Sequence, residues 1–295
     1  MFSSNPLTIL DGVPIFMRED KYALEYDRIA QDHLDHEAVH GVNPFMTENQ
    51  IGDSDMVTLS LAQRHFRSGA RILDAGIGLG SIFRSLGGFR RFGVDVALPY
   101  LRRTRKFGIE VARAKIEKLP FFDEYFDGVL STDVLEHVHR LDAATAELIR
   151  VLRPGGCLVV RVPNEESLES YVENDQGYQH THVRSFSLDG LRLHFGQCYG
   201  LEYLEHAYAG FDFTIHHQLR FPPPRGADPV VHLLRAHADD SPALKQLSLL
   251  VTTNLEEAVD ALIELRAHRP ELFAQMAPNL LKAKEVVVVF RKPAI

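Results

Sequence analysis

The stretch Arg71-Ile72-Leu73-Asp74-Ala75-Gly76-Ile77-Gly78-Leu79-Gly80-Ser81 decides the fold, because in it a short apolar strand runs into three alternating glycines. Glycines at the carboxyl end of a strand let the backbone turn tightly and approach a ligand closely. A dinucleotide-binding loop, G-x-G-x-x-G, would need a glycine at position 81, where this chain has Ser81. The third glycine is instead Gly80. The pattern therefore predicts a nucleotide-binding strand, turn and helix whose spacing departs from that of dinucleotide sites.

Size and charge limit the classes of function. With 295 residues, 45% of them apolar, the chain can bury one large core or two modest ones. It has 32 Lys and Arg against 40 Asp and Glu, a net charge of −8, which disfavours nucleic acid as a substrate. A basic cluster between positions 84 and 106 is expected to be a solvated helical face rather than a docking surface.

The two cysteines, Cys157 and Cys198, are too few for a zinc ribbon or a disulfide framework, and they fit a reducing, cytoplasmic location. The amino terminus lacks a basic region followed by a long apolar run, and no window approaches about 18 uninterrupted apolar residues. We therefore expect a protein that is neither secreted nor membrane-spanning.

Strand-like runs recur after the glycine motif, separated by segments of helix or loop character. They lie at 92–96, 109–112, 126–131, 157–162, 201–208 and 285–290. This alternation predicts a parallel sheet with helices on both faces. The clearest helix runs from Asp142 to Leu152, since its apolar residues share one face and Pro154-Gly155-Gly156 ends it.

Three regions are expected from this pattern. Residues 1–68 form a helical lid segment outside the sheet, with helices at 21–35 and 55–67. Residues 69–208 with 284–295 form the cofactor-binding core. Residues 209–283 form a mostly helical cap on the substrate side, with helices at about 230–238, 242–251, 254–268 and 270–282.

Four further motifs follow the glycine motif in a fixed order. They are Asp95, Glu117-Lys118-Leu119-Pro120-Phe121, Asp133-Val134-Leu135-Glu136-His137-Val138, and Leu152-Arg153-Pro154-Gly155-Gly156. In order and spacing they resemble the signatures of the class I S-adenosylmethionine-dependent methyltransferases, in particular the subgroup that includes the ubiquinone- and menaquinone-biosynthesis enzymes. The resemblance covers about residues 70–208 and the terminal strand. It implies an α/β, Rossmann-like sheet of seven mostly parallel strands, the last one antiparallel, plus the helical insertion.

The resemblance also implies S-adenosyl-L-methionine as the cofactor and S-adenosyl-L-homocysteine as the product. The expected cofactor-binding residues are Tyr26, Asp74, Gly76, Gly78, Gly80, Asp95, Val96, Ile116, Glu117 and Asp133. A carboxylate at the end of the second strand can accept hydrogen bonds from both ribose hydroxyls, which is the role expected of Asp95. The alternative is an aspartate that caps the helix beginning near Ala97.

The other cofactor contacts follow the same resemblance. Asp74 and the glycines should line the methionine part, although Asp74 could serve the turn alone. Adenine is expected near Ile116 and Glu117, where Lys115 replaces an aspartate that the family often has; lysine carries donors only. Tyr26 lies in a run that resembles a helix closing over the cofactor, with simple core packing as the alternative.

Candidate catalytic bases are Asp133, His216, His217 and His182, in falling order, and His137 is expected to brace its loop. Asp133 follows the fourth strand at the carboxyl edge of the sheet, where ligands of open α/β sheets bind. His180 and His182 have the spacing of two ligands on an extended strand, but a third ligand is missing, so no metal is expected.

The sequence therefore favours a methyltransferase that acts on a small molecule, with oxygen preferred over nitrogen or carbon as the acceptor. A non-catalytic protein that binds the cofactor and positions a partner is the main alternative. A nicotinamide-dependent oxidoreductase is opposed by the missing glycine at position 81. A small-molecule acceptor is the expected partner, without nucleic acid, and a homodimer is left open.

Overall fold

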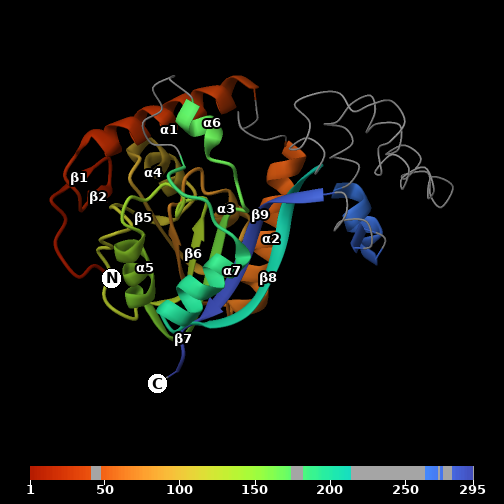
Figure 1. Cartoon of the computed structure of the whole chain (residues 1–295). Coiled ribbons are helices and arrows are strands. Elements are labelled where there is room, and N and C mark those ends of the chain that lie inside the picture. Colours follow the sequence, from red (N-terminus) through yellow and green to blue (C-terminus); the bar gives the residue numbers. More distant parts are fainter. Residues whose placement is uncertain (41–47, 174–181, 214–262, 272, 275–280, 295) are drawn as a thin grey trace. The chain divides into compact units, whose positions relative to one another are not determined.

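The computed structural model describes residues 1–40, 48–173, 182–213, 263–271, 273–274 and 281–294 (Figure 1). The chain divides into two compact units. The first comprises Met1–Phe45, Asp55–Tyr208 and Glu285–Ile295, and the second Met46–Ser54 and Ala209–Lys284. None of the described helices combines the length and the hydropathy that crossing a membrane requires.

One sheet organises the chain, with the strand order β1-β2-β5-β4-β3-β6-β7-β9-β8. The strands are β1 (Thr8–Leu10), β2 (Val13–Ile15), β3 (Arg71–Ala75), β4 (Arg90–Asp95), β5 (Glu110–Arg113), β6 (Phe126–Thr132), β7 (Leu152–Pro163), β8 (Glu202–Phe213) and β9 (Leu281–Arg291). Strands β5, β4, β3, β6 and β7 pair in parallel, and β9 pairs antiparallel with β7. The Rossmann-like α/β class and the antiparallel last strand are confirmed.

The predicted number of strands is wrong, because the described residues already form a sheet of nine strands rather than seven. The two additional strands form the hairpin β1–β2, within residues expected to lie outside the sheet, and β2 joins β5. Asp11 and Gly12, which connect them, both have positive φ, 52° and 77°. An Asp-Gly pair in this conformation forms the tight turn typical of hairpins. The three-residue strands were too short to show a periodic pattern.

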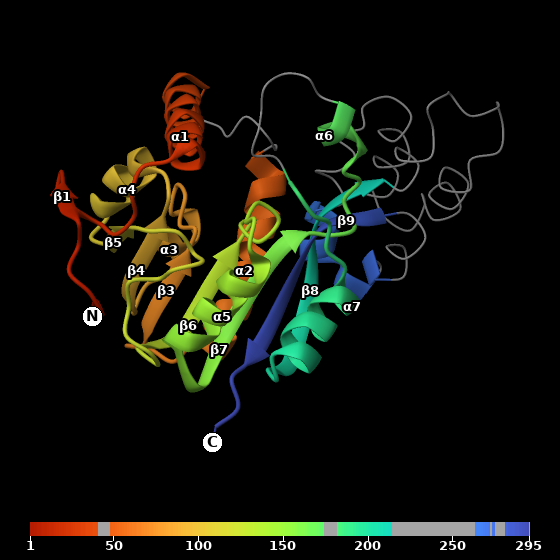
Figure 2. The same cartoon turned by 60° about the vertical axis from the view of Figure 1, so that its left-hand side comes forward.

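Helices cover both faces of the sheet. They are α1 (Lys21–His40), α2 (Glu48–His65), α3 (Ser81–Ser85), α4 (Leu98–Arg105), α5 (Leu141–Val151), α6 (Glu169–Glu173), α7 (Leu188–Leu191) and the π-helix η1 (Arg192–Cys198). Apolar residues of α5, α7 and η1 pack on one face, and those of α3 and α4 pack on the other. Figures 1 and 2 place α1 beyond the carboxyl ends of the parallel strands.

The core has two apolar layers because both faces of the sheet are covered. In β9, Val286 and Val288 belong to one layer, and Val287 and Val289 to the other; all four are fully buried. Fully burying such a side chain contributes about 1.5–3 kcal/mol. Continuous apolar strands of this kind are typical of a sheet that is covered on both sides.

Predicted boundaries agree with the structure within two residues for β4, β5, β6 and α5. Three strands are longer than expected: β7 begins at Leu152 rather than 157, β8 ends at Phe213 rather than 208, and β9 begins at Leu281 rather than 285. The helix expected at 21–35 continues to His40, and the one expected at 55–67 begins earlier, at Glu48. Most of the expected cap, residues 209–283, lies outside the described residues. Within it, residues 263–268 are helical, inside the helix expected at 254–268.

Candidate active site

The glycine turn between β3 and α3 leaves space at the carboxyl edge of the sheet. Gly76, Gly78 and Gly80 all have positive φ. A Cβ atom on Gly76 would lie 2.1 Å from a methyl carbon of Val134, and one on Gly80 would lie 2.8 Å from a methyl carbon of Thr104. At Gly78, by contrast, no heavy atom lies within 4 Å of that position. The turn therefore needs glycine for packing at two points and for backbone conformation at all three.

Asp95, at the end of β4, ties this turn to the start of α4. One carboxylate oxygen accepts a hydrogen bond from the amide of Gly78 (2.9 Å), and the other accepts one from the amide of Ala97 (2.8 Å). Burial raises the pKa of Asp95 to about 6, although these amides lower it. Each oxygen can accept a further hydrogen bond. Asp95 thus binds the amide of the residue that precedes α4 and keeps acceptor capacity for a ligand.

Asp74 provides a buried carboxylate beside the turn. It is 2% exposed, and its Oδ1 has no hydrogen-bond partner among the described residues. Burial raises the pKa of Asp74 to about 8; Asp95 raises it further and Arg161 lowers it. A buried acceptor without a partner costs free energy. A cationic or hydrogen-bond-donating ligand group would satisfy it.

Helix α1 is fixed to this edge through Asp27. Its carboxylate accepts a hydrogen bond from the amide of Leu98 (2.7 Å), at the start of α4, and one from the guanidinium of Arg113 (2.8 Å). Arg113 is 4% exposed and also donates to the carbonyl of Val96. The sequence analysis missed Asp27 and Arg113, because only the fold brings the two segments together.

Two tyrosines of α1 pack above Asp95. The rings of Tyr22 and Tyr26 lie 4.7 Å apart, and that of Tyr26 lies edge-on, 6.1 Å from His137. Burial raises the pKa of both phenols, and Asp95 and Glu136 are among the carboxylates that raise the pKa of Tyr26. Tyr26 therefore lies between the glycine turn and the loop after β6.

Lys115, which stands where the family often has an aspartate, is directed toward the same helix. Its ammonium pairs with Asp20 and lies 5.2 Å from the ring centre of Tyr22. Glu117 is among the carboxylates that raise the pKa of Tyr22, and Ile116 is buried. Lys115 and Glu117 of the predicted adenine region thus lie near Tyr22 of α1.

Asp133 is held by a buried arginine. The guanidinium of Arg161, in β7, donates to both carboxylate oxygens of Asp133, at 2.6 and 3.2 Å. Arg161 also donates to Asp55 (2.9 Å), and Glu285 lies 3.6 Å away. Asp133 has a φ of 56°, a strained conformation of the kind that clusters at functional sites. Both carboxylate oxygens of Asp133 are therefore engaged by Arg161.

A second cluster includes Glu136 and His137, which follow Asp133 in the same loop. The rings of His137 and His182 lie 4.5 Å apart, and Nε2 of His137 lies 4.0 Å from the carboxylate of Glu136. Nδ1 of His182 contacts Glu166, whose other oxygen accepts a hydrogen bond from Tyr171 (2.8 Å). Burial raises the pKa of Glu136 well above its ordinary value. The sequence analysis missed Glu136, Glu166 and Arg161.

The chain is similar in sequence to a known protein family over the region that contains the glycine turn, Asp95 and Asp133. Residues 73–160 match the family described as a methyltransferase domain. An uncharacterized protein of Methanocaldococcus jannaschii is 32% identical over 160 residues, which make up 53% of this chain and 67% of that protein. The chain belongs to the class I S-adenosylmethionine-dependent methyltransferases.

Other relatives share the methyltransferase domain. A tRNA (carboxymethyluridine(34)-5-O)-methyltransferase of Arabidopsis thaliana is 35% identical over 98 residues, 32% of this chain and 24% of that protein. A Haloferax volcanii methyltransferase, solved in complex with the Trm112 methyltransferase activator, has a TM-score of 0.54 at 18% identity, over 94% of this chain and 100% of that one. This likeness shows the fold. The chain spans 55% and 67% of the length of two M. jannaschii relatives.

S-adenosylmethionine is the cofactor of this family, and the residues present fit it. The space beside Gly78 and the unpartnered oxygen of Asp74 suit an amino-acid moiety that carries an ammonium group. The remaining acceptor capacity of Asp95 suits a ribose with two hydroxyls. When bound, the cofactor supplies an activated methyl group.

Most of the predicted site residues lie along this one edge of the methyltransferase sheet. Among the predicted bases, Asp133 and His182 are near it, whereas His216 and His217 lie outside the described residues. The roles assigned to the individual residues stay predictions.

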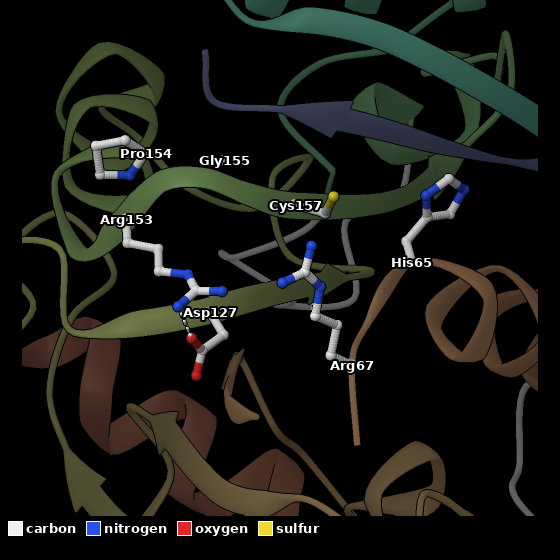
Figure 3. Close-up of a pocket in the computed structure, with 7 residues that line it drawn as sticks. All are labelled: His65, Arg67, Asp127, Arg153, Pro154, Gly155 and Cys157. Carbon is white, nitrogen blue, oxygen red and sulfur yellow. Dashed lines mark ion pairs between the residues drawn. The ribbon is translucent and has the colours of Figure 1, made fainter. Parts of the chain in front are cut away.

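A pocket of about 210 Å³ lies at the opposite edge of the sheet, where the parallel strands begin (Figure 3). It is lined by His65, Arg67, Asp127, Arg153, Pro154, Gly155 and Cys157. Asp127 pairs with Arg153 (2.6 Å) and accepts from the amide of Arg71 (2.6 Å), so its charge is satisfied within the protein. Ligands of open α/β sheets bind at the carboxyl ends instead.

Proposed function

We propose that this chain transfers the methyl group of S-adenosylmethionine to an oxygen atom of a small molecule. The observation that carries the proposal is that Tyr26 lies close both to Asp95, the proposed ribose-binding carboxylate, and to Glu136 and His137. The proposed donor site and a set of polar groups thus lie near one aromatic side chain. The resemblance to the ubiquinone- and menaquinone-biosynthesis subgroup belongs to this proposal.

Alignment should contribute most to the rate. The methyl group is already activated, and good orientation of two reactants can supply roughly 7–11 kcal/mol. A hydroxyl acceptor also has to lose a proton, for which a base typically contributes about 10²- to 10⁴-fold. Of the two described candidates, His182 is oriented by Glu166, whereas Asp133 is engaged by Arg161. The geometry therefore favours His182 over Asp133.

A small acceptor is supported by the net charge of −8, since binding to RNA usually needs a basic surface. Under the same proposal residues 1–68 act as a lid, and residues 209–283 form the cap on the acceptor side. A cytoplasmic location also belongs to this proposal. A homodimer is left open.

A tRNA acceptor is the second candidate, because the Arabidopsis relative is named for a tRNA uridine substrate. A nitrogen or carbon acceptor, or a cofactor-binding protein without turnover, are the remaining alternatives. Incubating the protein with radiolabelled S-adenosylmethionine and either a panel of small hydroxyl and amine compounds or total tRNA separates them. Label in small hydroxyl compounds supports the proposal. Label in tRNA alone, or no label despite cofactor binding, contradicts it.

The Asp95→Ala variant is the matched control for that assay. It should lose methyl transfer through weaker cofactor binding while its circular dichroism stays unchanged. Transfer at the wild-type rate by this variant would show that the label does not come from the proposed site.

A further inference from the structure

Three potential metal ligands lie together in the loop after β6 and the segment before α7. They are Glu136, His137 and His182, and one ligand atom of each lies within 4.8 Å of the others. Glu136 and His137 are neighbours in sequence, whereas His182 comes from more than 40 positions further along, as the numbering shows. Two imidazoles and one carboxylate are the protein ligands of many catalytic zinc sites and also suit other divalent transition metals.

The carboxylate of Glu136 points independently to a bound cation. This residue is 1% exposed, and neither oxygen has a hydrogen-bond partner in another described residue. His137 Nε2, at 4.0 Å, is too far away for a hydrogen bond. A buried polar group without a partner costs free energy, and a metal ion would supply that partner.

His182 carries the support that metal-binding histidines usually have. Its Nδ1 contacts the carboxylate of Glu166, and the hydroxyl of Tyr171 lies 3.2 Å from the same nitrogen. A histidine that binds a metal commonly donates its other ring N–H to a carboxylate, which fixes the orientation of the ring. With Nδ1 engaged in this way, Nε2 of His182 is the nitrogen left to bind a metal.

We propose that Glu136, His137 and His182 bind one divalent transition-metal ion of the Zn²⁺ type. Zinc bonds of roughly 2.0–2.1 Å in a tetrahedron hold neighbouring ligand atoms about 3.4 Å apart. Small side-chain rotations would therefore close the 4.8 Å spread. The sequence analysis expected no metal because it found no third ligand for the His180 and His182 pair; folding brings Glu136 and His137 to His182.

The role of the ion rests on the proposed function, although its binding does not. Three protein ligands leave a coordination position for an acceptor oxygen, and a zinc ion lowers the pKa of an oxygen that it binds. The ion then takes over the role that the proposed function gives to His182 as a base, and the hydroxyl proton passes to solvent. This fits a site in which Asp133 is engaged by Arg161.

Titration with Co²⁺ tests the proposal on the full chain after treatment with a chelator. Co²⁺ takes the place of Zn²⁺ and gains visible absorption bands when it is bound by several protein ligands. The variants are Glu136→Gln and His182→Ala. The matched control is His65→Ala, because His65 is 16% exposed against 18% for His182 and is likewise paired with a glutamate, Glu205, at 2.6 Å.

The wild-type chain and the His65→Ala control should bind one equivalent of Co²⁺, with Zn²⁺ displacing it. Each of the two site variants should bind at least tenfold more weakly. Wild-type protein that shows no bands, or folded site variants that bind like the wild type, would overturn the proposal. Circular dichroism checks that each variant is folded. The result for either folded site variant is enough to decide the proposal. Because neither cofactor nor acceptor is present, this outcome is independent of whether the protein transfers methyl groups.

Discussion

At the scale of single residues, the buried carboxyl of Asp74 makes the stability of the protein depend on pH. Its pKa in the folded protein is about 8, far above the ordinary value of 3.8. Between these two values the folded state holds a proton that the unfolded state has lost. The free energy of unfolding therefore falls as the pH rises through this window, by at most about 1.4 kcal/mol per pH unit.

We predict that Asp74→Asn removes this dependence. Between pH 5.5 and 7.5 the wild type should lose roughly 2 kcal/mol of stability relative to the variant, as measured by urea denaturation at each pH. Saturating S-adenosylhomocysteine should reduce the difference, because its ammonium group stabilises the ionised carboxylate. Parallel pH curves for the two proteins would show that Asp74 is ionised in the folded state throughout.

Arg161 is the residue whose loss should cost most stability. Arg161→Met leaves the carboxylates of Asp133 and Asp55 without their buried partner, and removing one side of a buried ion pair costs about 3–5 kcal/mol. Denaturation midpoints measure this loss. Arg140→Met, at an exposed arginine with one loose ion pair to Asp142, is the control and should change stability little. An equally small loss in both variants would contradict the account.

The sequence predicted single residues best where one short motif contains the whole feature. The glycine turn is of this kind, since one run of residues from Arg71 to Ser81 contains the strand, the three glycines with positive φ and the start of the helix. Arg161 and Glu136 were missed because their significance depends on partners far along the chain. Buried charge cannot be inferred from a run such as Leu135-Glu136-His137, which looks like any loop after a strand.

At the scale of elements, helix α1 depends on a few polar anchors. Asp27 joins it to the amide of Leu98 and to Arg113, so it fixes the helix that carries Tyr22 and Tyr26. We predict that Asp27→Ala weakens binding of S-adenosylhomocysteine about tenfold or more, because the helix loses its position over Asp95. Isothermal titration calorimetry measures this effect.

Asp35→Ala is the control on the same helix, because Asp35 is exposed and accepts a hydrogen bond from its neighbour Gln31. It should bind the cofactor product like the wild type. Equal weakening by both variants would mean that general loss of helix stability, rather than the Asp27 anchor, lowers the affinity.

The elements were predicted well where the pattern was long and periodic, as in α5 and the strands of the parallel core. The hairpin β1–β2 was missed, although its Asp11-Gly12 turn is a recognised hairpin signal, because the flanking strands have three residues each. The early start of α2 was missed because Glu48 to Ser54 are largely polar and lack an apolar face.

At the scale of the whole molecule, the order of the motifs along the chain and the order of the strands in the sheet agree. The parallel strands β5, β4, β3, β6 and β7 bring every described part of the proposed site to one edge, and the pocket at the other edge contains the ion pair between Asp127 and Arg153. The sequence therefore predicted the class of the fold. It could not predict which distant loops meet at that edge, since this depends on tertiary packing.

The central claim is that this edge binds S-adenosylmethionine. Calorimetric titration of the purified protein with S-adenosylhomocysteine, with NAD as the control ligand, tests it most directly. We predict micromolar binding of S-adenosylhomocysteine, at least tenfold weaker binding in a folded Asp95→Ala variant, and none of NAD. Binding of NAD, no binding of S-adenosylhomocysteine, or unchanged affinity in the variant would contradict the account.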